Sequence, residues 1–331
     1  MRAWLERYAN RLWYDTARPA WPWRALSGLH HRLLGTRWQR PPARPPVPVL
    51  VVGNLAVGGS GKTPVVIALA RHLSGLGRQA AIISRGYGRA SRSSAARQPI
   101  RVGPDSDPGL CGDEPVLIGQ ATGLPVWVCR DRSAALNAAV AAGADVVLAD
   151  DGLQHRRLAR SFEIVLVDAR LGFGNGLLLP GGPLRQPVAR LDLADAVLFR
   201  GAGDRAIDAD RRFDLKPEAL VRMDDGARLT PDALAGQAVS AVCGIANPKQ
   251  FVRSLIALGY APRLFAFPDH HRFRAAELES IPGPIVTTAK DAVKLRLLTG
   301  LPKTIHVLEV NAVLPDALLQ AVADHVQQFD R

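Results

Sequence analysis

The segment "VLVVGNLAVGGSGKTP" (residues 49–64) decides the fold. The apolar run Val49–Val52 predicts a buried strand, and a glycine-rich turn then leads directly into a helical pattern that begins at Thr63. Backbone N–H groups of such a turn can surround phosphate oxygens at a helix N-terminus, where the helix dipole also favours negative charge. The segment therefore predicts a phosphate-binding loop (P-loop). We assign to it Gly58, Gly59, Ser60, Gly61, Lys62 and Thr63.

Lys62 and Thr63, at the end of this loop, have expected chemical roles. We expect Lys62 to reach the β and γ phosphates of ATP, and the Thr63 hydroxyl to bind Mg²⁺. The strict P-loop pattern has glycine at position 56, where this chain has Ala56. Alanine can form the same turn if its φ is negative, so we interpret the segment as a variant P-loop.

A pair of acids predicts the metal site. "ADVVLADDGLQH" (residues 144–155) places Asp150 and Asp151 at the end of an apolar strand. Two adjacent carboxylates suit Mg²⁺, one directly and one through water, because this ion keeps several of its waters. An acidic pair at a strand end is also a common helix N-cap, but the P-loop in the same chain favours the metal.

The rest of the chain alternates short β-rich runs with helical patterns. Such alternation predicts an α/β fold, with a P-loop NTPase-like parallel sheet, helices on both faces and a second, smaller α/β domain. Expected strands are 49–52, 80–84, 126–129, 146–149, 164–168, 196–199, 239–243, 264–267, 285–288 and 307–310. Expected helices are 63–74, 113–121, 132–142, 248–258 and 315–328.

These patterns suggest three regions. We expect an amphipathic membrane-associating region at 1–40, a P-loop kinase domain at 41–212, and a smaller α/β domain with linker strands at 213–310; a C-terminal helix within 311–331 would pack back on the kinase domain. Five of the six tryptophans lie in the first 38 residues, and one expected helical face is apolar and aromatic. That face suits a bilayer interface, packing on its own domain, or an oligomer contact. Its members are Trp4, Leu5, Tyr8, Leu12 and Trp13.

Composition limits the partners. The net charge of +12 favours an acidic partner, either a phosphate ester, a nucleic acid or anionic lipid. The basic residues are spread along the chain and no recognition module is visible, so we expect no nucleic acid. Three cysteines make a disulfide framework improbable and fit a reducing cytoplasm. Neither a secretory leader nor a run of 18 apolar residues occurs.

Two acids and two histidines are candidates for the chemistry of transfer. Asp113 and Glu114 in "CGDEP" begin an expected helix, where acids are ordinary caps, yet Asp113 could also be the general base of phosphoryl transfer. "FPDHHRF" offers His270 and His271, one of which could orient that base if two domains close over a cleft.

Three further residues are candidates for binding anions. Arg185 lies in "GNGLLLPGGPLRQP", a segment too apolar to be a solvent-exposed flexible linker. The Arg185 side chain could stabilise charge on the transferred phosphoryl group. Arg85 and Tyr87 in "SRGYGR" could hold an anionic sugar or phosphate. Each of these segments could also be an ordinary surface loop.

Taken together, these motifs resemble the lipid A 4'-kinases, also called tetraacyldisaccharide 4'-kinases. The segments that carry the resemblance occur in this order: "VGNLAVGGSGKTP", "SRGYGR", "GDEP", "ADDGLQH", "FGNGLLLPGGPLR", "FPDHHRF" and "TTAKDAVK". Alanine at position 56 looks like the family's own loop variant. The chain departs from the resemblance at Gln186, where many relatives carry an acid.

The resemblance implies ATP-dependent phosphorylation of the 4'-hydroxyl of an acylated disaccharide 1-phosphate, with Mg²⁺. The enzyme would act as a peripheral protein on the anionic cytoplasmic face of the inner membrane. The implied roles are phosphate binding by Lys62, Thr63 and Arg185, metal binding by Thr63, Asp150 and Asp151, catalysis by Asp113 helped by His270, and substrate binding by Arg85, Tyr87 and Glu114.

Two other functions share some of these motifs. A regulatory P-loop NTPase that switches a membrane or metallochaperone partner would have the same loop, aspartate and sheet, but water would be its acceptor. A nucleic-acid-dependent NTPase is suggested only by the basic charge, and it would bind DNA or RNA in a strongly salt-dependent way.

Overall fold

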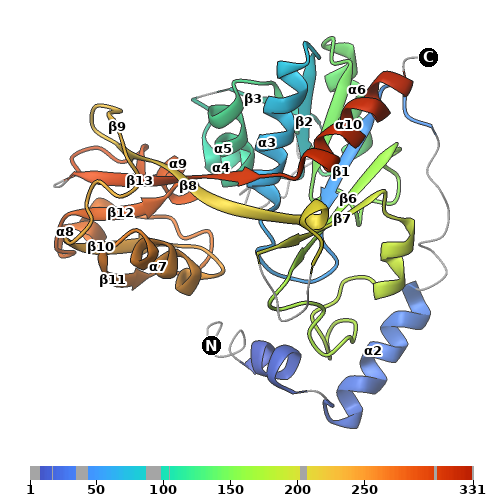
Figure 1. Ribbon diagram of the computed structural model, residues 1–331, viewed down its shortest axis with the longest axis horizontal. Coiled ribbons are helices and arrows are strands. Elements are labelled where there is room, and N and C mark those ends of the chain that lie inside the picture. Colours follow the sequence, from blue (N-terminus) through green and yellow to red (C-terminus); the bar gives the residue numbers. More distant parts are fainter. Residues whose placement is uncertain are drawn as a thin grey trace.

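The strands of this computed structural model form one continuous sheet (Figure 1). The structure describes residues 8–16, 18–34, 44–86, 98–103, 105–201, 207–301 and 304–329. Within them, the strand order is β11-β10-β12-β13-β8-β7-β6-β1-β5-β2-β4-β3, with β9 paired to β8. The α/β class and the mostly parallel sheet with helices on both faces are confirmed.

The P-loop strand β1 (Val49–Gly53) lies in the middle of the larger half of this sheet, where it pairs in parallel with β5 (Val146–Asp150) and β6 (Phe162–Asp168). All five of its residues are buried, because β1 has a paired strand on each side and the sheet is covered on both faces. The other strands here are β2 (Ala80–Ser84), β3 (Ile100–Val102), β4 (Val126–Val128) and β7 (Ala196–Arg200), of which β3 alone is antiparallel to its neighbour.

Alternate residues of β1 bury the two faces of the sheet. Leu50 and Val52 belong to a core that includes helices α3 (Lys62–Gly75), α5 (Asp113–Thr122) and α10 (Asp316–Phe329), and the short α4 (Pro108–Cys111). Val49 and Val51 belong to the core under α6 (Arg132–Ala141). Helix α10 therefore packs on the P-loop side of the sheet, close to α3. We call β1–β7 with α3–α6 and α10 the large domain.

Two long strands connect the large domain to the rest of the chain. β8 (Arg212–Arg222) pairs in parallel with β7 and then antiparallel with β13 (Ile305–Val313), and both cross between the two halves of the molecule (Figure 1). Two turns of 3-10 helix, Val188–Leu193 and Ala209–Arg211, flank β7.

The small domain is a second α/β layer at the far end of these strands. It contains β9 (Arg228–Leu229), β10 (Ala238–Cys243), β11 (Ala261–Ala266) and β12 (Ile285–Thr288). Helix α7 (Pro248–Ala257) belongs to the core on one face, while α8 (Ala275–Glu279) and α9 (Ala289–Leu295) supply residues to the cores on the other. Helix α9 also contacts α5, so the two domains touch outside the sheet.

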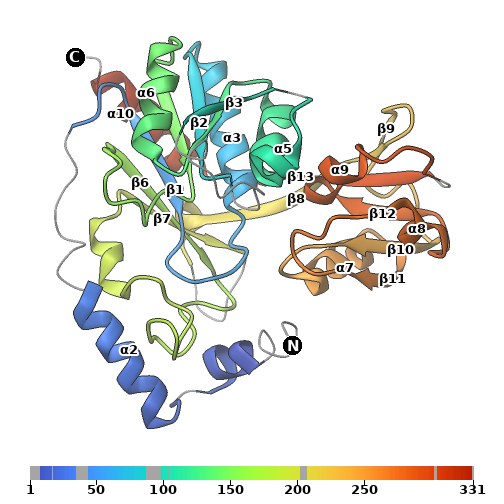
Figure 2. The same ribbon diagram turned by 180° about the vertical axis from the view of Figure 1, so that it is seen from behind.

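The N-terminal segment lies against a loop of the large domain (Figure 2). It contains a π-helical turn, η1 (Arg11–Asp15), and helix α2 (Trp21–Leu34). Trp13 Nε1 donates a hydrogen bond to Pro180 O at 2.9 Å, and Ser27 Oγ donates one to Leu178 O at 2.6 Å. Of the predicted aromatic face, Trp4 and Leu5 lie outside the described residues.

Strand β8 was expected only as one of the linker strands within 213–310, without bounds. Pro217 and the charged residues around it break the two-residue alternation of a strand. In the structure Pro217 pairs with Val310, next to a register shift, and a bulge of this kind tolerates proline. β3, β9, α8 and α9 were not expected, and β13 is longer than predicted.

The three cysteines, all within described parts of the chain, are buried and form no disulfide, as expected. Among the residues that the structure describes, none of the helices combines the length and the apolar character needed to cross a membrane.

Phe213 anchors the start of β8 and gives a test of this packing. Its side chain is 1% exposed, so Phe213→Ala should lower the free energy of unfolding by about 3 to 5 kcal/mol through lost burial and the cavity left behind. Urea unfolding followed by circular dichroism measures this loss. The control is Lys216→Ala on the same strand, an exposed position where we expect a change within about 0.5 kcal/mol.

Candidate active site

The P-loop has the backbone that its sequence predicts. Gly58 and Gly61 have φ values of 131° and 86°, which side-chain-bearing residues rarely adopt. Ala56 is not among the described residues with positive φ, so the turn does not need glycine at that position. A Cβ atom on Gly61 would lie 3.4 Å from both Phe213 and Leu215, so strand β8 closes over the loop.

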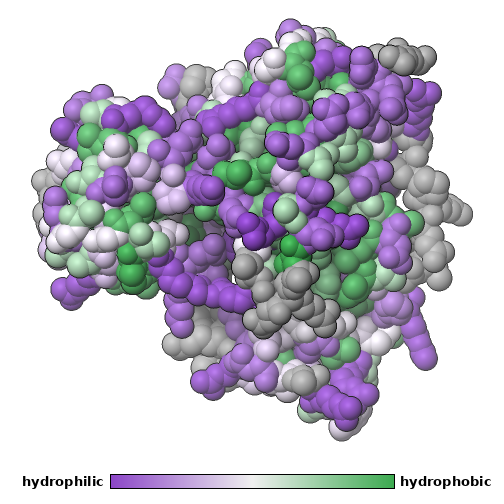
Figure 3. Space-filling view, in the orientation of Figure 1, coloured by the Kyte–Doolittle hydropathy of each residue, from purple (hydrophilic) through white to green (hydrophobic). Residues whose placement is uncertain are grey.

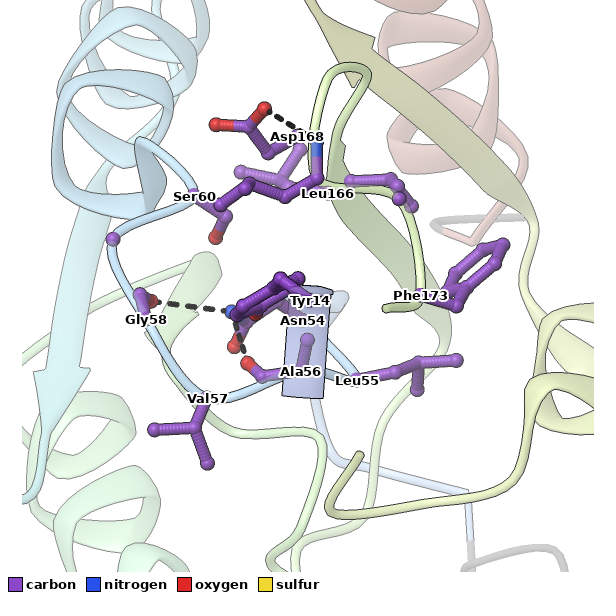
Figure 4. Close-up of a pocket in the computed structure, with 14 residues that line it drawn as sticks. Tyr14, Asn54, Leu55, Ala56, Val57, Gly58, Ser60, Leu166, Asp168 and Phe173 are labelled. Carbon is purple, nitrogen blue, oxygen red and sulfur yellow. Dashed lines mark hydrogen bonds between the residues drawn. The ribbon is translucent and has the colours of Figure 1, made fainter. Parts of the chain in front are cut away.

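Asn54 fastens the P-loop from inside. Its side-chain nitrogen donates to Ala56 O at 2.6 Å and to Gly58 O at 3.4 Å, as the dashed lines in Figure 4 show. Its oxygen accepts a hydrogen bond from Lys62 Nζ at 3.1 Å. The ammonium of Lys62 is therefore held at the mouth of the loop, next to the backbone amides that would meet phosphate.

A pocket lies beside the P-loop (Figure 4). Its walls are the loop itself, the end of β6 with Asp168, the following turn with Phe173, and Tyr14 from the N-terminal segment. Burial and the charge of Asp168 raise the pKa of Tyr14 above its ordinary value, so the phenol stays neutral at physiological pH. The pocket next to the P-loop is thus partly aromatic, with Asp168 as its acidic side chain.

Asp150 and Asp151 lie at the carboxyl end of β5, next to the P-loop. Burial, with the neighbouring charges of Glu114 and Asp151, raises the pKa of Asp150 to about 7. Its Oδ1 is buried and has no hydrogen-bond partner among the described residues. A buried, unpartnered carboxylate oxygen of this kind is suited to a cation.

Asp151 has the opposite electrostatic state. Burial alone would raise its pKa, but Lys62 and Arg185 lower it below the ordinary value. Lys62 Nζ lies 3.7 Å from Asp151 Oδ1, and Arg185 NH1 lies 3.2 Å from Oδ2. Asp151 also has a φ of 51°, unusual for a residue with a side chain. The structure therefore brings the expected P-loop, metal and arginine residues together.

The apolar loop that carries Arg185 packs against the P-loop. Arg185 N donates to Leu55 O at 2.7 Å, and Val57 N donates to Pro183 O at 2.8 Å. Gln154 joins the two segments, since its Nε2 donates to Asn54 O at 3.0 Å and to Gln186 Oε1 at 3.3 Å. Gln186 is completely buried, where its side chain supports Gln154.

Asp113 contacts two side chains from the other domain, His270 and Lys294. At the first turn of α5, its Oδ2 lies 3.1 Å from His270 Nδ1 and 3.1 Å from Lys294 Nζ. Burial would raise the pKa of Asp113, but the hydrogen bond from His270 and the charge of Lys294 together lower it. The carboxylate is thus ionised at neutral pH and can accept a proton.

The structure also separates the two histidines. His270 contacts Asp113 and has a φ of 62°, whereas His271 Nε2 lies 3.0 Å from Glu277 Oε2. His271 also packs between Phe267 and Phe273, away from Asp113. Only His270 is placed to act with the acid.

A second lysine of the small domain contacts Glu114. Lys290 Nζ lies 3.3 Å from Glu114 Oε1, 3.2 Å from Asp269 Oδ1 and 3.4 Å from His270 Nε2. The side chains of this junction are charged, and Figure 3 shows mainly hydrophilic surface where the small domain meets the large one.

The remaining predicted residues are less defined. Arg85 is exposed just beyond β2, and its charge acts on Arg132 and His155. Tyr87 lies outside the described residues.

Our sequence analysis missed several residues of this site. They are Asn54, Arg132, Gln154, His155, Lys290 and Lys294. Asn54, Gln154 and His155 lie inside motifs that we quoted, and the two lysines lie in "TTAKDAVK", so the motifs contained the signal. Arg132 is buried at the start of α6 with NH2 3.4 Å from Asp151 O, and no local pattern marks it.

Comparison with known proteins shows the family of the chain. Residues 19–327 match the family model of LpxK, tetraacyldisaccharide-1-P 4'-kinase. The chain belongs to this family. It is 44% identical over 282 residues to the tetraacyldisaccharide 4'-kinase of Pseudomonas aeruginosa (strain LESB58), covering 82% of this chain and 83% of that protein. The enzyme of the same name from Pseudomonas fluorescens (strain Pf0-1) is 48% identical over 255 residues, covering 76% and 74%.

A solved structure is also similar. The crystal structure of LpxK from Aquifex aeolicus in complex with ATP has a TM-score of 0.72 and 27% identity, covering 91% of this chain and 98% of that one. The activity of the chain is thus ATP-dependent phosphorylation of the 4'-hydroxyl of a tetraacyldisaccharide 1-phosphate, a lipid A precursor. As a kinase of this family, it is an enzyme of lipid A biosynthesis.

The raised pKa of Asp150 predicts a gain in stability for one variant. Between its ordinary value of 3.8 and about 7, the folded protein keeps a proton that the unfolded chain releases, so this group destabilises the fold progressively as pH rises. Asp150→Asn should therefore raise the free energy of unfolding of the ligand-free protein by about 2 kcal/mol at pH 8 and by much less at pH 4. Urea titrations at both pH values measure the difference, and a gain independent of pH would contradict this assignment.

Proposed function

We propose that Asp113 is the general base that removes the proton of the 4'-hydroxyl as this oxygen attacks the γ-phosphorus of ATP. The observation that carries the proposal is the contact of Asp113 Oδ2 with His270 and Lys294 at 3.1 Å each. Asp113 Oδ1 makes no hydrogen bond or ion pair within the described part of the chain, which leaves it available to a hydroxyl. A positioned carboxylate of this kind contributes typically a factor of about 10² to 10⁴ to the rate.

His270 acts through Asp113. A proton on Nδ1 and a lone pair on Nε2 satisfy its contacts with Asp113 Oδ2 and with Lys290 Nζ. The ring then donates to the carboxylate and fixes its orientation. The left-handed backbone at position 270 is consistent with a residue whose placement matters more than local stability.

The P-loop and two cationic side chains hold the triphosphate of ATP in this proposal. Backbone amides from Gly58 to Lys62 surround phosphate oxygens, and the ammonium of Lys62 leaves Asn54 to meet the β and γ phosphates. Arg185, which contacts Asp151 Oδ2, neutralises charge on the transferred phosphoryl group. The bond from the γ-phosphorus to the bridging oxygen breaks as the bond from the 4'-oxygen forms, and ADP leaves.

Mg²⁺ is the cation that fits the oxygen donors of this site. We propose that Asp150, Asp151 and Thr63 hold it, since Asp150 has a buried, unpartnered oxygen, Asp151 lies next to Lys62 and Thr63 is the last residue of the P-loop. When bound, the ion neutralises charge on the phosphate oxygens. The described residues contain no group of three or more His, Cys, Asp or Glu side chains arranged for a metal, so the ATP phosphates would supply the remaining ligands.

The acceptor is anionic and acylated, and the proposed contacts follow from that chemistry. Arg85, with Tyr87 from the segment that is not described, would bind the anionic part of the lipid. Glu114 would contribute to the acceptor site while it is paired with Lys290.

We further propose that the N-terminal region places the enzyme on an anionic membrane, at the cytoplasmic face of the inner membrane. Helix α2 presents Trp21, Leu26, Leu29 and Leu33 to solvent, with 77%, 48%, 55% and 62% of each residue exposed. The spacing of Leu26, Leu29 and Leu33 puts these three on one side of the helix, whereas Ser27, which donates a hydrogen bond to the loop below, lies on another side. A row of exposed apolar side chains with flanking arginines suits a lipid interface.

This assignment gives the three regions of the chain separate tasks. Residues 1–40 would attach to lipid, residues 41–212 with the helix of 311–331 would bind ATP, and residues 213–310 would supply His270 across the linker strands β8 and β13.

Removal of the base gives a direct test of the mechanism. Asp113→Asn should lower transfer of label from γ-labelled ATP to the acylated disaccharide 1-phosphate by about 10² to 10⁴-fold, because the amide cannot accept the proton. The KM for ATP should change little, and Lys62→Ala should abolish turnover. Release of labelled phosphate without label in the lipid would instead favour a regulatory NTPase, and near-normal transfer by Asp113→Asn would remove the proposed base.

Introducing negative charge on the exposed side of α2 tests the proposal that this helix binds the membrane. Replacing Leu26, Leu29 and Leu33 together by Asp should reduce cosedimentation with phosphatidylglycerol vesicles at least about tenfold, because apolar burial in the interface is lost. The matched control replaces Leu110, Leu193 and Leu297, three exposed leucines elsewhere, by Asp. If both triple variants bind vesicles equally, α2 packs on the protein and does not attach it to the membrane.

A further inference from the structure

The motif "TTAKDAVK" (residues 287–294) supplies contacts to Asp113, Glu114 and His270, but no role of its own has been assigned to it. It covers the end of β12 and helix α9, in the small domain. Its three charged residues are Lys290, Asp291 and Lys294. Two of them are buried, Asp291 at 0% exposure and Lys294 at 8%. Charged groups are rarely buried to this extent unless they are paired, so their partners indicate their purpose.

Lys294 lies between two carboxylates from different domains. Its Nζ is 3.0 Å from Asp291 Oδ1 on its own helix and 3.1 Å from Asp113 Oδ2 on α5. The stem of the side chain packs near Phe273, with Nζ 5.4 Å from the centre of the ring. Because the ammonium is buried next to an aromatic ring, its charge is weakly screened and its electrostatic attraction to both carboxylates is strong.

Asp291 fixes the far side of this arrangement. Its Oδ2 accepts hydrogen bonds from Gly244 N at 2.9 Å and from Thr288 Oγ1 at 2.8 Å. Gly244 O in turn accepts a hydrogen bond from His270 N at 3.3 Å. The same buried carboxylate thus holds Lys294 and the backbone that supports His270.

We propose that Lys294 is a positioning residue for the kinase reaction, whose ammonium, anchored by Asp291, crosses from the small domain to orient Asp113 Oδ2 and keep that carboxylate ionised. This inference rests on the proposed role of Asp113 as base. Lys294 and His270 both contact Oδ2, which leaves Oδ1 for the acceptor hydroxyl. Because α9 and β12 belong to the small domain, the base is fully set only while the two domains are in contact. Arg296 NH1, which donates to Gln120 Oε1 at 3.0 Å, extends the same contact along α5.

The test is the pH profile of kcat/KM for the acylated disaccharide 1-phosphate. Charged and titratable groups near Asp113 are Glu114 on α5, Asp269 and His270 on the loop, and Lys290, Asp291 and Lys294 on α9. Lys294→Met removes one positive charge and keeps the length of the side chain. The acid limb of the profile should then move to higher pH by about one unit or more, since an unpaired buried carboxylate binds its proton more tightly.

Three comparisons make this result specific. Lys294→Arg keeps the charge and should restore most of the wild-type acid limb, while KM for ATP should stay within about threefold in both variants, because Lys294 makes no contact with the P-loop. Lys249→Met on α7, an exposed lysine of the same domain, should leave the profile unchanged. A loss of activity in Lys294→Met that is equal at every pH would indicate a merely structural role and overturn the inference.

Folding and mechanism can be separated. Lys294→Met leaves two buried carboxylates facing one another, so the double variant Asp291→Asn/Lys294→Met, which removes both charges, is measured beside it. A wild-type acid limb in whichever variant folds, or failure of both to fold, would overturn the positioning role. If Asp113→Asn itself retains near-normal transfer, the proposed base is wrong; if that variant is inactive and Lys294→Met has the wild-type profile, only the present inference fails.

Discussion

The antiparallel hydrogen-bond ladder between β8 and β13 is the constraint on which the site depends. It pairs residues 214–222 with residues 306–313, and it is the covalently continuous and hydrogen-bonded link between the two domains. On one side of it are the P-loop, Asp150 and Asp151. On the other are His270 and Lys294. Asp113 contacts His270 and Lys294 because this ladder, together with the contact between α5 and α9, holds the small domain against the first turn of α5.

The electrostatics of the site follow from how charge is distributed over these two sides. Burial, with the charges of Glu114 and Asp151, raises the pKa of Asp150, whereas cationic neighbours lower the pKa values of Asp151 and Asp113. Asp150 is therefore harder to ionise than the other two carboxylates. Carboxylates with pKa values pushed in different directions are what separate tasks in metal binding and proton transfer require.

Much of this could be predicted from the sequence, for a definable reason. The P-loop, the paired aspartates and the central strands are local patterns, in which the residues that matter lie within about one strand and one turn of each other. Asp113 and His270 are 157 residues apart, and no local pattern shows that they meet or that His271 turns instead to Glu277. Family resemblance, not periodicity, suggested that pair. Strand β8 was expected only as a linker strand without bounds, because Pro217 interrupts its alternation and lies beside the register shift between β8 and β13.

The meeting of Gly61 with Phe213 and Leu215 has a consequence for how the nucleotide loop and the link between the domains are related. The two apolar side chains belong to the first turn of the strand that leads out of the large domain, and they rest on the last glycine before Lys62. The P-loop glycine and the start of the strand that leads to the small domain therefore share one packing site, so a change of side chain at either place affects both the nucleotide loop and the link between the domains.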